Sequence, residues 1–214
     1  MNTTAHLFIF GGGGFAREVA WLARQTLGEH VELTMLVDHE RYLTPAQNGT
    51  EVRLLRDARP GPGSQFVVAV GDGSLRERAA KACEDARLVP ATIVHPRVER
   101  SNFVEIGTGS IICAGSILTT NIHIESHVIV NLDCTVGHNV VIDDFATLSP
   151  GVHVSGYVTI GRGALIGTGA TIIEGSASER LVIGAGAIVA AGACVTRSVE
   201  PGALVAGVPA VRKR

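Results

Sequence analysis

The hydrophobic positions of this chain follow two different periods. In the first part, short apolar runs alternate with segments in which apolar residues recur every three or four positions. The runs predict strands and the helical spacing predicts helices, at residues 7–10, 32–38 and 66–70 and at residues 15–28 and 74–87 respectively. Ser74, with Glu77 three positions later, is the expected cap of the second helix.

Beyond residue 94 the helical spacing disappears and an aliphatic residue recurs at every sixth position. The repeat slips once, by five residues, and its members are Ile106, Ile112, Leu118, Ile124, Val130, Val136, Ile142, Leu148, Val154, Ile160, Ile166, Ile172, Ile183, Val189 and Val195. A fixed period is typical of a solenoid, and six residues suffice only for a brief strand and a corner. Burial of each inward aliphatic side chain should contribute roughly 1.5–3 kcal/mol to the stability of the folded chain.

The two patterns predict two domains. Residues 1–92 are expected to form an α/β domain of Rossmann type, because strands alternate with helices. Residues 93–214 are expected to form an all-β domain, with a loop pushed out near residues 176–181. The hexads resemble the left-handed parallel β-helix of hexapeptide acyltransferases, in which three hexads make one coil of eighteen residues. The left-handed crossover comes from this resemblance, since parallel crossovers are otherwise right-handed.

Composition limits the classes of partner that the chain is expected to bind and the compartment in which it is expected to work. The chain is 46% hydrophobic but 4% aromatic, and its net charge of −2 offers no basic field to nucleic acid. Its four cysteines lack a C-x-x-C spacing, which favours reduced thiols in the cytoplasm. No apolar run is long enough for a transmembrane helix or a signal peptide, so membrane insertion is not expected.

His138 is the candidate catalytic residue. With eighteen residues per coil, Gly156 lies one layer above it, roughly 4.7–4.9 Å away. A base beside a backbone N–H suits acyl transfer, because the base takes a proton from the attacking group while the N–H holds the oxygen of the tetrahedral intermediate. The alternative is an ordinary polar corner residue. A zinc site of the gamma-carbonic-anhydrase type is not expected, because none of the other nearby histidines is a whole coil from it: His123, His127 and His153.

Three segments resemble bacterial sugar acyltransferases of the sialic acid O-acetyltransferase family, which includes N-acetyltransferases acting on nucleotide-linked aminosugars. They are FIFGGGGFAREV, VGHNVVIDDFATLSPGVHVSG and VTRSVEPGALVAGVPA. The resemblance implies a homotrimer with acetyl-CoA in the groove between two β-helices. It also implies that His138 is the general base, that the Gly156 amide contacts the thioester carbonyl, and that Thr168 and Ala191 line the groove.

Asn139 departs from this family, which usually places Asp or Glu directly after the catalytic histidine. An amide orients the ring but supplies no charge to the imidazolium. We expect Asn139 to act as the orienting group. The sequence does not rank the candidates to replace the missing acid, of which the nearest are Asp133, Asp143 and Asp144.

The glycine cluster between the first strand and helix offers backbone N–H groups to phosphate, and Asp38 follows the second strand, where an acid accepts ribose hydroxyls. The family segment matching GDG after the third strand contacts the nucleotide sugar. The expected substrate-binding residues are therefore Gly12, Gly13, Gly14, Asp38, Gly71, Asp72 and Arg76.

Together these features favour acetyl-CoA-dependent N-acetylation of a nucleotide-linked aminosugar for surface glycan biosynthesis. O-acetylation of sialic acid or another sugar is the first alternative. A non-catalytic sugar-binding trimer is the second, with Asn139 as the sign of a decayed site.

Overall fold

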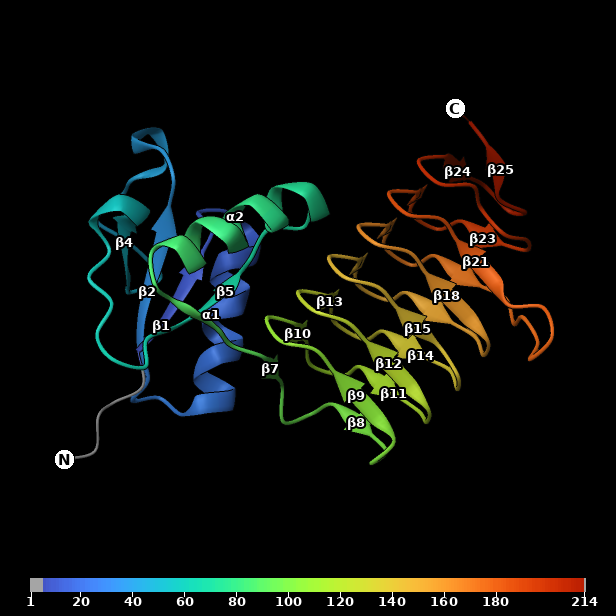
Figure 1. The fold of residues 1–214 in the computed structure, drawn as a ribbon, viewed down its shortest axis with the longest axis horizontal. Helices are drawn as coiled ribbons and strands as arrows, with labels where there is room; N and C mark the ends of the chain where they lie inside the picture. The colour runs from blue at the N-terminus through green and yellow to red at the C-terminus, as the bar shows by residue number, and fades with distance from the viewer. Residues whose placement is uncertain (1–5, 214) are drawn as a thin grey trace.

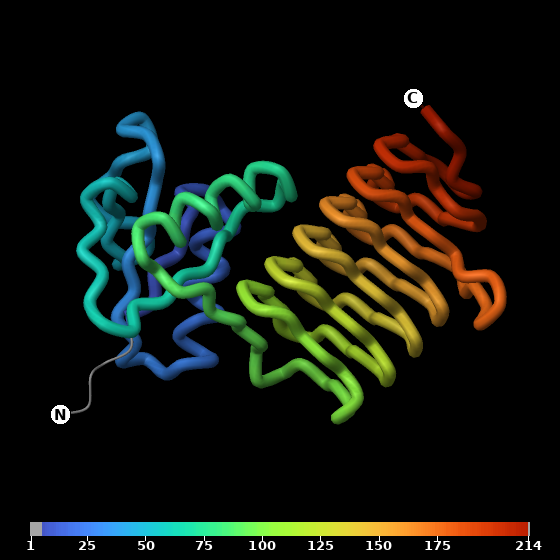
Figure 2. The backbone as a smooth tube through the Cα atoms, in the orientation of Figure 1, coloured from blue at the N-terminus to red at the C-terminus, as the bar shows by residue number. Residues whose placement is uncertain are grey.

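The structure, a computed structural model, describes residues 6–213 (Figure 1). A mostly parallel sheet with a helix on each face is followed by a long stack of short strands. Both helices lie close to the predicted segments, and the stack of coils is clear in the backbone trace (Figure 2).

The first sheet has the strand order β3-β4-β2-β1-β5-β6, and only β3 and β4 pair antiparallel. Its strands are β1 (His6–Phe10), β2 (Glu32–Val37), β3 (Ala46–Gln47), β4 (Thr50–Leu54), β5 (Gln65–Val68) and β6 (Val89–Pro90). The helices are α1 (Gly14–Leu27) and α2 (Gly73–Asp85), with 3-10 turns at Glu40–Tyr42 and Leu55–Asp57.

The alternation of side chains along β1 explains why this sheet is covered on both faces. Leu7 and Ile9 pack with α1, whereas Phe8 and Phe10 pack with α2. The α1 core continues into the stack, where it includes Ile93, Ile111 and Ile129. Helix α1 therefore joins the first sheet to the stack through apolar contacts.

The stack consists of three mostly parallel sheets, and each complete coil contributes one strand to every sheet. The first holds β7 (Ile93–Val94), β10 (Ile111–Ile112), β13 (Ile129–Val130), β16 (Thr147–Leu148), β19 (Leu165–Ile166), β22 (Ile188–Val189), β24 (Leu204–Ala206) and the antiparallel β25 (Val211–Arg212). The second holds β8 (Glu99–Arg100), β11 (Ile117–Leu118), β14 (Thr135–Val136), β17 (His153–Val154), β20 (Thr171–Ile172) and β23 (Cys194–Val195). The third holds β9 (Val104–Ile106), β12 (Ile122–Ile124), β15 (Val141–Ile142), β18 (Val158–Ile160) and β21 (Leu181–Ile183).

The register confirms the eighteen-residue coil. Along the second sheet, Ile117 pairs with Thr135, Thr135 with His153, and His153 with Thr171. The next pairing, Thr171 with Cys194, skips five more residues, because a loop leaves the corner between β20 and β21. The hexad aliphatics form the buried core of the stack, as the periodicity predicts.

One local expectation is wrong. The cap of α2 is Asp72 rather than Ser74: the Asp72 carboxylate accepts a hydrogen bond from the Leu75 N–H at 2.8 Å, and the Ser74 hydroxyl donates to the same oxygen. These bonds hold the pKa of Asp72 below its usual value. A carboxylate also interacts favourably with the helix dipole, which a serine hydroxyl does not.

Candidate functional site

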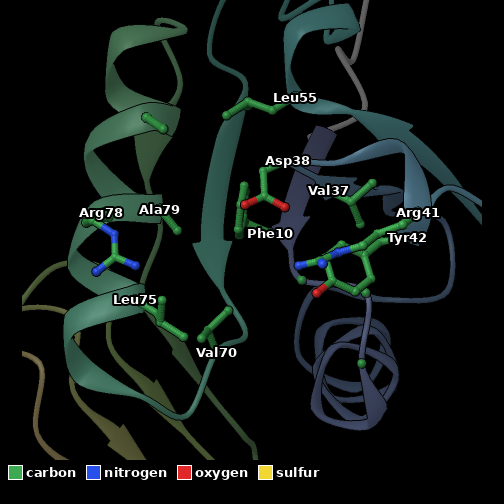
Figure 3. Close-up of a pocket in the computed structure, with 14 residues that line it drawn as sticks. Phe10, Val37, Asp38, Arg41, Tyr42, Leu55, Val70, Leu75, Arg78 and Ala79 are labelled. Atoms are coloured by element: carbon green, nitrogen blue, oxygen red, sulfur yellow. The ribbon is translucent and has the colours of Figure 1, made fainter.

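A cavity of about 490 Å³ lies at the carboxyl ends of β1, β2 and β5 (Figure 3). Ligands in open parallel sheets bind at this edge. Gly12 and Gly13 line the cavity from the turn after β1, and Asp38 lines it from the end of β2. The structure thus brings together three of the seven residues expected to bind substrate, and their role in binding stays a prediction. Gly14 does not line it; this residue begins α1.

Three polar residues of this cavity were not predicted. Arg41 and Tyr42 come from the short turn after Asp38, and the Arg41 guanidinium stacks on the Tyr42 ring, 4.6 Å from its centroid. Arg78 lines the cavity from α2, and Figure 3 shows it across the cavity from Arg41 and Tyr42. Two guanidinium groups and a Gly-rich turn form a suitable environment for phosphates, and Asp38 for hydroxyls.

The turn from β5 to α2 contacts both the cavity, through Val70, and the stack, through Gly71 and Gly73. The Gly71 carbonyl accepts a hydrogen bond from the Thr147 hydroxyl at 2.8 Å, and a Cβ on Gly73 would lie 2.6 Å from the Phe145 carbonyl oxygen. Asp72 is exposed and caps α2. Gly71 and Asp72 themselves do not line the cavity.

The prediction that Arg76 binds substrate is wrong. Its side chain is only 1% exposed, and its guanidinium donates to five backbone carbonyls: those of His127, Val70, Gly71, Phe145 and Ala146. Burial lowers its pKa to about 10, so the group stays charged at neutral pH. Arg76 holds α2 against the stack and has no donor left for a sugar.

His138 lies at the corner between the second and third sheets of the stack and is 45% exposed. Its Nδ1 lies 3.0 Å from the Asn139 side-chain oxygen. Because an amide oxygen only accepts hydrogen bonds, Nδ1 carries the hydrogen and Nε2 is free to take a proton. The Tyr157 ring meets the imidazole edge to face, with the centroids 5.2 Å apart.

Gly156 lies directly against this imidazole, as the coil arithmetic predicts. A Cβ built on Gly156 would lie 2.6 Å from Cε1 and 2.8 Å from Nε2 of His138. The neighbouring N–H groups of Ser155 and Tyr157 bind the carbonyls of Ile172 and His138, and the Gly156 N–H makes no such ladder bond within residues 6–213. A base and a free backbone donor therefore meet at one corner.

Replacing Gly156 by alanine is expected to lower kcat for acyl transfer by about 10- to 100-fold, because the methyl group displaces the imidazole from its place over the backbone. The backbone itself tolerates alanine, since Gly156 does not have a positive φ. Steady-state kinetics with Gly61→Ala as the control test this, because a Cβ on Gly61 meets nothing within 4 Å. Equal kcat in the two variants would contradict the close packing.

Asn139 has a left-handed backbone, with φ of 58°. Asparagine adopts this conformation more readily than most residues, but so does aspartate, as Asp133 shows with φ of 55°. The backbone therefore does not explain why an amide stands here. None of the carboxylates considered from the sequence contacts His138. Asp144 instead binds Arg162 at 2.6 Å, and Asp133 and Asp143 lie on the other two corners.

A carboxylate that the sequence analysis missed lies closer. Glu174 Oε1 is 3.4 Å from Nε2 of His138. Glu174 is two coils beyond His138, so continuing the same arithmetic past Gly156 would have found it. It lies in the extruded loop, two residues after the end of β20.

Thr168 and Ala191 are exposed and stack on each other, with the Gly192 N–H donating to the Thr168 carbonyl at 2.9 Å. They lie on the corner between the first and second sheets, whereas His138 lies on the next corner. One chain therefore does not bring them together with the base. Their place on the acyl-CoA path stays a prediction that requires a second chain.

The other histidines of the stack are engaged elsewhere. His123 lies between Glu105 and Glu125, at 2.8 and 2.9 Å, and His153 contacts the Thr135 hydroxyl. His127 is buried and stacks on Phe145, and burial lowers its pKa. Across residues 6–213 no group of three or more metal-ligating side chains converges.

The buried thiols are poor nucleophiles. Burial raises the pKa of Cys113 to about 12 and that of Cys134 to about 11, so both are protonated at neutral pH. The four cysteines are all free. Direct attack by a bound acceptor on an acyl donor, assisted by His138, therefore suits this site better than a covalent thiol intermediate.

Comparison with known proteins gives matches over almost the full chain. The chain is 33% identical over 206 residues to GDP-perosamine N-acetyltransferase of Escherichia coli O157:H7. The aligned region covers 94% of this chain and 93% of that protein. WeeI from Acinetobacter baumannii AYE superposes with a TM-score of 0.91 at 33% identity, over 98% of this chain and 100% of that one.

A mutant of perosamine N-acetyltransferase from Caulobacter crescentus, in complex with CoA and GDP-perosamine, superposes with a TM-score of 0.88 at 28% identity, over 98% of this chain and 97% of that one. No family model matches the chain. Within the described residues, no helix is both long enough and apolar enough to cross a membrane.

Proposed function

The chain belongs to the bacterial sugar N-acetyltransferases with a β-helix fold, and from this we propose that it transfers the acetyl group of acetyl-CoA to the amine of a nucleotide-linked aminosugar. The observation that carries the proposal is His138 lying over the backbone of Gly156 on one corner of a chain that matches such enzymes along its length. GDP-perosamine, bound in a related structure, is the first acceptor to test.

In the proposed reaction, the sugar amine attacks the thioester carbonyl carbon and its proton passes to Nε2 of His138. The Gly156 N–H donates to the oxygen that becomes negative in the tetrahedral intermediate. When the C–S bond breaks, the imidazolium returns the proton to the CoA sulfur. Asn139 supports these steps by holding Nδ1–H and thereby fixing the ring.

The acceptor nucleotide is proposed to bind in the cavity of the first sheet, which functions as a Rossmann-type site. Gly12 and Gly13 offer backbone N–H groups to the diphosphate, and Arg41 and Arg78 supply the opposite charge. Asp38 accepts ribose hydroxyls and Tyr42 offers an aromatic face. The mixture of charged and aromatic groups is consistent with a nucleotide.

We further propose a cytoplasmic homotrimer of left-handed β-helices. A trimer would bring the column of Thr168 and Ala191 from one chain towards the His138 corner of another, which a single chain does not do. Acetyl-CoA and nucleotide sugars are cytoplasmic metabolites, and four free cysteines are consistent with a reducing compartment.

Incubation with acetyl-CoA and a panel of GDP-, UDP- and dTDP-linked aminosugars tests the function by mass spectrometry. We expect an acetamide product with a GDP-aminosugar and release of CoA. A product with a base-labile ester would support O-acetylation instead. Absence of product from every acceptor, together with absence of CoA binding, would favour a non-catalytic sugar-binding trimer.

A further inference from the structure

The corner that carries His138 contains a negative charge, although the residue directly after the histidine, Asn139, is neutral. When His138 accepts a proton, its Nδ1–H faces only the neutral amide oxygen of Asn139. At the other side of the ring, however, Glu174 Oε1 lies 3.4 Å from Nε2. A carboxylate at this distance attracts a positive charge that develops on the ring during the reaction.

The loop that carries Glu174 is fixed to the same corner at both ends. Glu174 follows β20 directly after Ile173, and Arg180 precedes β21. The Arg180 guanidinium donates to the Asn139 carbonyl at 2.7 Å, to the Val158 carbonyl at 2.8 Å and to the Thr159 hydroxyl at 2.9 Å. Arg180 thus ties the loop to the backbone of the residue that orients His138.

Few charged or titratable groups face the imidazole. Tyr157 contacts its edge and Glu174 contacts Nε2, while Arg180 is directed to the carbonyl of Asn139. The separation of 3.4 Å is longer than an ordinary N–H···O hydrogen bond, so the contact between Glu174 and Nε2 is a charge contact. Glu174 is 58% exposed, so its influence is moderated by solvent.

We propose that the Glu174 carboxylate is the counter-ion of the His138 imidazolium during acyl transfer. This inference rests on the proposed function and adds a positioning residue to it. The amine forms a bond to the thioester carbonyl carbon and loses its proton to Nε2. Glu174 stabilises the resulting cation until the C–S bond breaks and the proton passes to the CoA sulfur. The acid absent at position 139 is replaced two coils further along the chain.

Glu174→Gln tests the proposal by removing the charge and keeping the size. We expect kcat with acetyl-CoA and GDP-perosamine to fall about tenfold, with the KM for the sugar unchanged. Glu179→Gln on the same exposed loop is the matched control, expected to behave as the wild type.

The double variant Asn139→Asp with Glu174→Gln gives a second readout. A carboxylate at position 139 should restore part of the lost kcat, because it supplies the charge from the Nδ1 side of the ring. If the wild type is active and Glu174→Gln has the same kcat as Glu179→Gln, the proposal is overturned and the function is left intact. A rise in the sugar KM alone would overturn it too, by making Glu174 a substrate ligand. An inactive wild type would instead refute the function itself.

Discussion

The His138→Ala variant is expected to lose about a thousandfold or more in kcat for acetyl transfer, because general-base catalysis contributes in this range. Without Nε2 the attacking amine has no acceptor for its proton, and the C–S bond has no donor for the leaving sulfur. The imidazole is 45% exposed, so its removal should have little effect on the fold.

Release of CoA, followed with a thiol reagent, measures this loss. His138→Asn tests whether shape alone suffices, since it retains a polar side chain at the corner without a basic nitrogen. His30→Ala controls for removing an exposed histidine elsewhere in the chain. A kcat of His138→Ala within tenfold of the wild-type value would show that His138 is not the general base.

The stack could be predicted because its signal is local. Each hexad places one aliphatic residue inward, and the slip after Ile172 shows directly where a loop leaves the coil. The contact between His138 and Gly156 follows from the same arithmetic, since parallel strands keep their register from coil to coil. Glu174 follows from the same spacing, because it lies 36 residues, or two coils of eighteen, beyond His138.

The cavity of the first sheet was harder to predict in full. Asp38 follows a clear strand, whereas Arg41 and Tyr42 lie in an irregular turn whose path depends on packing. Arg78 is a helical residue with no distinguishing pattern of its own. Which arginine of α2 faces the cavity and which faces the stack is decided by how the helix docks, and helical spacing alone does not specify that.

Arg76→Met is expected to reduce the free energy of unfolding by about 3 kcal/mol, since it leaves several buried carbonyl oxygens without a donor. Nη1 binds the carbonyls of Val70 and Gly71, and Nε and Nη2 bind carbonyls of the stack. Burial of the guanidinium is itself unfavourable, as its lowered pKa indicates, and this limits the net loss.

The loss should be concentrated where the first sheet meets the stack. Amide hydrogen exchange in Arg76→Met is expected to accelerate along α2 and to change little in the hexads from β17 onwards, which have their own core. Arg78→Met, on the same helix but exposed, should leave both regions protected and shift the urea midpoint little. The five carbonyls that Arg76 binds come from both sides of this contact. If amide exchange in Arg76→Met accelerates equally in both regions, Arg76 does not hold the two parts together. The same conclusion follows if Arg76→Met unfolds at the same urea concentration as Arg78→Met, and apolar packing around α1 alone then accounts for the contact.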